Sequence, residues 1–137
     1  MNRLELALDL ALHVLIAYFA AMPIHELGHV AAALLLGGSA YWVPFEPRAY
    51  VAHPHPACMA VAMAAGGLTV FALYAFLSTR PWLYPVMRRA LFIVAVNQLI
   101  YGVFEGAGLG DLGSLLAHAA MLLLFLASVL WWGPGPP

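Results

Sequence analysis

Two histidines and a glutamate stand in an otherwise apolar stretch near the N-terminus, PIHELGHVA at residues 23–31. His25 and His29 are four residues apart, so on a helix both imidazoles project from one face and can hold a single zinc ion. Glu26 lies about 100° from His25 and about 60° from His29 around such a helix, which suits a base rather than a ligand. Zinc lowers the pKa of a water that it binds to about 7. The pattern therefore predicts zinc-dependent hydrolysis, with Glu26 accepting the proton of the attacking water.

A catalytic zinc site needs a third protein ligand and one open position. The glycine-rich stretch EGAGLGDLG at residues 105–113 offers two carboxylates. We expect Asp111 to be the third ligand, because the glycines around it allow the backbone to approach a metal closely. Glu105 is the alternative third ligand, or a neighbour of the metal without binding it. A plain role at a helix N-terminus is the other interpretation of Asp111.

The composition indicates which solvent surrounds this site. Of 137 residues, 65% are hydrophobic and 8% are charged, whereas soluble domains have roughly 45–50% apolar and about 25% charged residues. A soluble fold could not bury that much apolar surface, so the chain is predicted to lie in a lipid bilayer. A net charge of -1, with five arginines and no lysine, argues against nucleic acid as a partner. The single cysteine, Cys58, excludes an internal disulfide.

The predicted fold is an all-α membrane protein with about four transmembrane helices. The first, at about residues 4–36, would measure roughly 50 Å against a hydrocarbon core of about 30 Å, so we expect a long helix that is kinked at Pro23. The connection from Ser39 to Pro56 contains aromatic and β-branched residues in rough alternation and is predicted to be an edge strand or a re-entrant loop. The remaining helices are expected at about residues 57–77, 90–104 and 112–132.

These segments form one domain at residues 1–132, followed by a flexible Gly/Pro tail at residues 133–137. If each segment crosses the membrane once, the connection after the first and the break after the third lie on the same side. The histidine motif and Asp111 would then lie near the same membrane face. Gly66 and Gly67 in the second segment predict a smooth face for close helix packing.

The stretch HELGHVAAALLLGG at residues 25–38 resembles the first signature of the site-2 protease family of intramembrane zinc metalloproteases. Members also carry an aspartate, usually in Leu-Asp-Gly, at a later broken helix, and Asp111 in GLGDLG is the matching residue. The family's Asn-x-x-Pro-x-Pro run is absent: Asn97 lies 14 residues before Asp111, with no proline between them. Asn97 is a possible substrate contact by this resemblance, and an interior packing amide is the alternative.

The resemblance implies a minimal family member without regulatory domains, holding one zinc ion per chain. It would be an integral, multi-pass protein, expected in the plasma membrane, that hydrolyses peptide bonds in or near transmembrane segments of membrane-protein substrates. The substrate helix would unwind and pair with an edge strand, for which the loop residues Tyr41 and Val43 are candidates. Three alternatives stay open: an inactive homologue that binds membrane helices as an adaptor, a membrane metal carrier or sensor, and a zinc hydrolase of lipid-linked substrates.

Overall fold

The structure is a computed structural model that describes residues 2–43 and 48–131 of the chain. A long first helix is followed by a short hairpin and three further helices: α1 (Arg3–Leu35), β1 (Ser39–Trp42), β2 (Ala49–Ala52), α2 (Pro56–Ser78), α3 (Pro85–Gly106) and α4 (Gly110–Trp131). The predicted tail at residues 133–137 lies outside the described residues. The described part thus has the order of elements that the sequence predicted.

All four helices are long and apolar enough to cross a membrane. Large apolar side chains are exposed along their outer faces, for example Leu8, Phe19, Leu123 and Leu130. Such surfaces are unfavourable in water but suit contact with lipid tails. The prediction of an all-α, multi-pass membrane protein with four spanning helices is confirmed.

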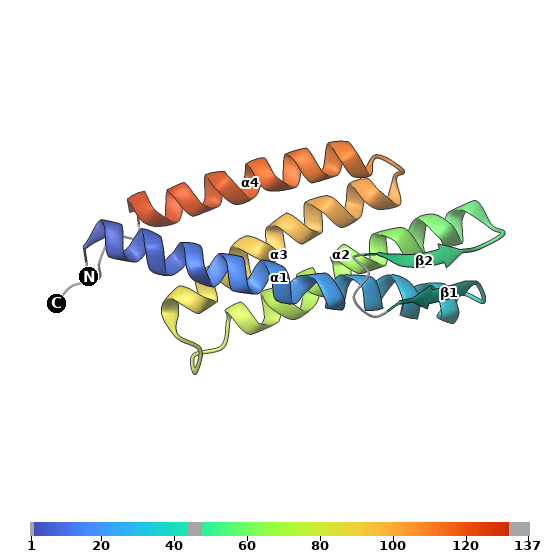
Figure 1. Cartoon of the computed structure of the whole chain (residues 1–137), viewed down its shortest axis with the longest axis horizontal. Coiled ribbons are helices and arrows are strands. Elements are labelled where there is room, and N and C mark those ends of the chain that lie inside the picture. Colours follow the sequence, from blue (N-terminus) through green and yellow to red (C-terminus); the bar gives the residue numbers. More distant parts are fainter. Residues whose placement is uncertain (1, 44–47, 132–137) are drawn as a thin grey trace.

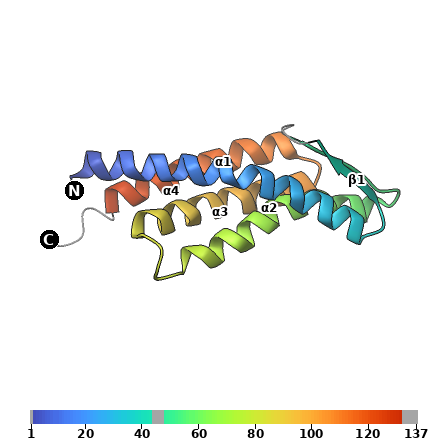
Figure 2. The same cartoon turned by 60° about the horizontal axis from the view of Figure 1, so that its bottom comes forward.

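The helices lie side by side, and different connections lie at the two ends of the bundle (Figure 1). The hairpin and the turn between α3 and α4 lie at one end of the bundle. The start of α1, the connection from α2 to α3 and the last turns of α4 lie at the other, as a second view also shows (Figure 2). This arrangement matches the prediction that the connections after the first and third helices share one side.

Helix α1 begins with a capping box, in which Asn2 and Glu5 exchange side-chain and backbone hydrogen bonds of 2.8 and 2.9 Å. It continues through Pro23 and ends before Gly37, whose φ of 82° is accessible to glycine at little cost. Its two halves point in slightly different directions in both views, as expected for a helix that contains an internal proline (Figures 1 and 2).

Helix α3 continues to Gly106, beyond the end expected at Phe104. Glycines persist in it because the backbone of α2 approaches closely: a Cβ atom on Gly106 would lie 2.8 Å from the Ala64 Cβ, and one on Gly67 would lie 2.6 Å from the Gly102 Cα. The predicted smooth face at Gly66 and Gly67 is therefore confirmed, and α3 breaks only at Gly108, with a φ of 75°.

The predicted edge-strand segment forms a two-stranded antiparallel hairpin that packs against α1. Tyr41 pairs with Tyr50, and their rings stack with centroids 4.8 Å apart. This pairing fixes the position of Ala49, the first residue of β2, beside the second half of α1.

Candidate metal centre

The two motif histidines converge on a carboxylate from α3. The Nε2 atoms of His25 and His29 lie 3.3 and 3.4 Å from Oε2 of Glu105. Within the described ranges, 2–43 and 48–131, this is the group of three side chains whose ligand atoms all lie within 4.8 Å of one another. Both histidines are buried, at 7% and 3% exposure. The set of two imidazoles and one glutamate is a known ligand set of catalytic zinc sites.

The outer nitrogen of each imidazole is held by a neighbouring helix. His25 Nδ1 donates to Oε1 of Gln98 on α3 at 2.8 Å, and His29 Nδ1 donates to the carbonyl of Ala62 on α2 at 2.9 Å. With Nδ1 as the donor in both rings, a neutral imidazole presents the lone pair of its Nε2 on the side of Glu105. Metal-binding histidines in proteins are oriented by hydrogen bonds of this kind.

The distances at Glu105 suit a cation between the groups better than direct hydrogen bonds. A charge-assisted N–H···O bond measures about 2.7–2.9 Å, and both contacts are longer than that. Ligand atoms around a tetrahedral zinc ion, at roughly 2.0–2.1 Å from the metal, are separated by roughly 3.3 Å. Oε2 of Glu105 is also buried without a hydrogen-bond partner among the described residues, while Oε1 accepts from the Tyr101 hydroxyl at 3.3 Å. The donor set and the two separations at Glu105 therefore fit zinc.

Close approach of α2 makes this arrangement possible. A Cβ atom on Gly66 would lie 2.5 Å from Cε1 and Nε2 of His29 and 2.8 Å from Cδ2 of His25. A Cβ atom on Gly28, on the same face of α1, would lie 2.9 Å from the Ala65 carbonyl oxygen. The two helices cross at glycines, so the imidazoles rest directly against the α2 backbone.

Asp111, which the sequence favoured as third ligand, does not join this group. It lies exposed in the first turn of α4, where its charge suits the positive end of the helix dipole. Glu105, the alternative, lies beside the two histidines instead. The signal for Glu105 was present in the sequence: Gln98, Tyr101 and Glu105 follow one another at helical spacing in the second half of α3.

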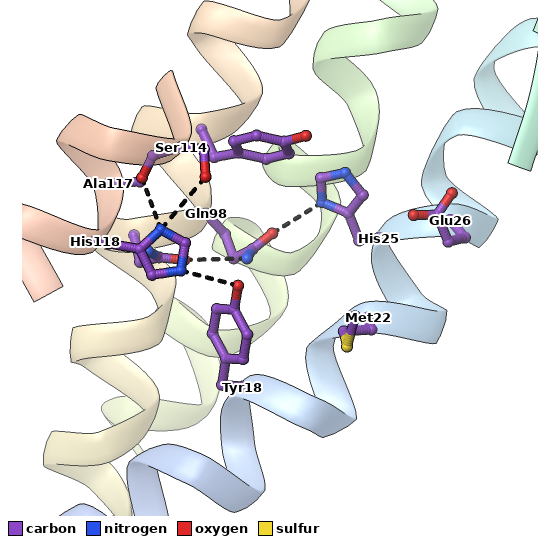
Figure 3. A pocket seen from close by; sticks show the side chains of 10 residues that line it. Tyr18, Met22, His25, Glu26, Gln98, Ser114, Ala117 and His118 are labelled. Carbon is purple, nitrogen blue, oxygen red and sulfur yellow. Dashed lines mark hydrogen bonds between the residues drawn. The ribbon is translucent and has the colours of Figure 1, made fainter. Parts of the chain in front are cut away.

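Polar groups from α3 extend from the centre into a cavity of about 200 Å³ (Figure 3). Asn97 is buried at 1% exposure, and its Oδ1 accepts from Nε2 of Gln98 at 3.1 Å. Its Nδ2 has no hydrogen-bond partner among the described residues, and Asn97 lines the cavity. Sequence reasoning missed the contact of Gln98 with His25.

The cavity lies between α1, α3 and α4, and a hydrogen bond crosses from α1 to α4 on one side of it. Nδ1 of His118 donates to the Ser114 carbonyl at 2.7 Å, so Nε2 accepts from the Tyr18 hydroxyl at 3.1 Å. All three residues line the cavity, and Figure 3 shows Tyr18 and His118 facing each other.

Glu26, the expected base, lines the same cavity as His25. Its Oε2 accepts a hydrogen bond of 2.5 Å from the backbone N–H of Ala49. The hairpin thereby holds the carboxylate in place. Tyr41 and Val43, the predicted substrate contacts, lie on the exposed side of the hairpin and do not line the cavity.

No family model matches the chain, and no curated protein or solved structure gives a significant match. The resemblance to the site-2 protease family therefore depends on the motif residues themselves.

Proposed function

We propose that this protein is an intramembrane zinc metallopeptidase in which His25, His29 and Glu105 hold one zinc ion and Glu26 is the general base. The observation that carries the proposal is the convergence of two imidazole Nε2 atoms on a buried carboxylate oxygen that has no hydrogen-bond partner in residues 2–43 and 48–131. An ionisable group buried in a membrane-spanning bundle is costly and is retained for function. Membership of the site-2 protease family, with a glutamate in place of the usual aspartate, is part of the same proposal.

Each side chain of the centre has a separate role in peptide hydrolysis. Zinc, when bound, polarises the scissile carbonyl and makes water more acidic. Glu26 accepts a proton as water adds to the carbonyl carbon, and it passes that proton to the amine nitrogen as the C–N bond breaks. Gln98 and the Ala62 carbonyl keep the two imidazoles oriented throughout.

The substrate of this proposal is a membrane protein whose transmembrane helix unwinds locally, because the backbone of an intact helix is shielded. The hairpin supports this interpretation, since its strand β2 runs beside Glu26 and an extended peptide can pair with a strand edge. The plasma membrane is the proposed location.

Metal analysis tests the ligand set. We expect about one zinc ion per purified wild-type chain, its loss in Glu105→Gln, and its retention in the matched variant Asp111→Asn. Glu26→Gln should keep zinc and lose cleavage of a membrane-protein substrate. Wild-type protein that neither contains nor binds zinc would refute the proposal, and zinc loss in Asp111→Asn but not in Glu105→Gln would restore Asp111 as the ligand.

A further inference from the structure

A second polar cavity lies at the opposite end of the bundle from the candidate metal centre. It has a volume of about 380 Å³ and is lined by residues at the end of α2 and the start of α3: Ser78, Pro85, Arg88, Arg89 and Phe92. This end also carries Trp82 and Trp131, which are 70% and 86% exposed. Exposed tryptophans mark the level of the lipid headgroups, so the cavity lies at the membrane–water boundary.

The cavity is positively charged. Two of its lining residues are arginines, and the Nε atom of Arg88 is buried without a hydrogen-bond partner among the described residues. A buried guanidinium nitrogen that lacks a partner favours an anionic ligand.

An apolar groove adjoins the charged cavity. Its volume is about 210 Å³, and its walls are side chains of α3 and α4, including Ile93, Leu124, Ala127 and Trp131. Phe92 lines both the groove and the charged cavity. A positive pocket at headgroup level that continues into an apolar groove is complementary to a molecule with an anionic head and a hydrocarbon tail.

From this continuity we infer that the protein has a binding site for one anionic phospholipid, with the phosphate at Arg88 and an acyl chain along the groove between α3 and α4. The site is separate from the candidate metal centre, and it does not depend on the proposed peptidase activity. A free phosphate ion has the same chemistry as the lipid phosphate, and competition by inorganic phosphate distinguishes the two ligands.

Native mass spectrometry of the purified, detergent-solubilised chain tests the site, with dioleoyl phosphatidylglycerol and dioleoyl phosphatidylcholine as probes. We expect preferential binding of phosphatidylglycerol to the wild type, and about fivefold weaker binding to Arg88→Gln, as one basic residue near the surface contributes. Arg3→Gln is the matched control: it removes the same charge from the same end of the bundle, outside the cavity. It should leave phosphatidylglycerol binding unchanged.

The groove is tested by Ala127→Phe, which fills it, with circular dichroism to verify that the variant keeps its helices. We expect weaker phosphatidylglycerol binding and no effect of inorganic phosphate as a competitor. Equal binding of the two lipids, or equal losses in Arg88→Gln and Arg3→Gln, would overturn the inference. Full displacement of the lipid by inorganic phosphate would show a site for free anions and would overturn the inference. A wild-type dimer that is lost in Ala127→Phe would show that a second copy of the chain fills the groove, and it would overturn the inference as well.

Discussion

Substitution of Gly66 by alanine should weaken zinc binding, although it removes neither a metal ligand nor a side chain that contacts one. The added Cβ atom would lie 2.5 Å from Cε1 and Nε2 of His29, whereas ordinary contacts begin at 3.4 Å. The His29 ring, or the whole of α2, must therefore move by about 0.9 Å. Zinc–ligand distances tolerate deviations of about 0.2 Å, so the displacement exceeds the tolerance several-fold.

We expect the zinc affinity of Gly66→Ala to fall by at least roughly 10–100-fold, the loss that follows when the supports of metal ligands are disturbed. Competition with a chromophoric chelator in detergent measures this affinity. Gly110→Ala is the matched control, because a Cβ atom there meets no heavy atom within 4 Å. Its zinc affinity should equal that of the wild type.

Circular dichroism and thermal unfolding of the zinc-free proteins separate a local effect from misfolding. The reasoning requires Gly66→Ala to keep its helices and to lose metal affinity. A variant with native helicity and wild-type zinc affinity would refute it, since the imidazoles could not then rest against the α2 backbone.

Three further changes test single contacts. Gln98→Ala removes the acceptor that orients His25 and should weaken zinc binding by roughly 10–100-fold. Gln98→Glu keeps an acceptor and should retain most of the wild-type zinc affinity. Unchanged affinity in Gln98→Ala would contradict this role of Gln98. Ala49→Pro removes the N–H that holds Glu26, so the cleavage rate should change while zinc content, measured by mass spectrometry, stays at the wild-type level. Tyr74→Phe removes a hydrogen bond of 3.0 Å to an α1 carbonyl and should lower the free energy of unfolding by about 1 kcal/mol, with zinc binding intact; a loss of zinc binding would show that the effect spreads beyond this contact.

The fold was largely predictable because the physical signals are local. Apolar runs of sufficient length give spanning helices, and the glycines after residue 36 and at Gly108 give their ends. The end of α3 was misplaced because Gly106 was treated as a helix breaker. In the bundle, α2 occupies the space that a side chain at Gly106 would take. Tertiary packing therefore offsets the weak helix propensity of glycine.

The same displacement explains why the sequence favoured Asp111 over Glu105. A helix that stopped at Phe104 would leave Glu105 in a loop, and the glycine-flanked Asp111 then looked better placed. Because α3 continues, Glu105 stays on the helical face that also carries Gln98 and Tyr101, directed at the α1 histidines. Helical spacing predicts such a face, but the residues that contact it are determined by the packing of α1 on α3.

The contact between Tyr18 and His118 has a consequence for how the cavity is reached. Helix α4 packs mainly on α3 and touches α1 much less, so this hydrogen bond spans a sparsely packed wall. One such bond contributes about 1 kcal/mol net, which corresponds to roughly a fivefold change in an equilibrium. Opening of this wall would therefore cost that one bond and the small packing contact between α1 and α4. Of the helix pairs that border the cavity, α1 and α4 close it with the least protein–protein contact.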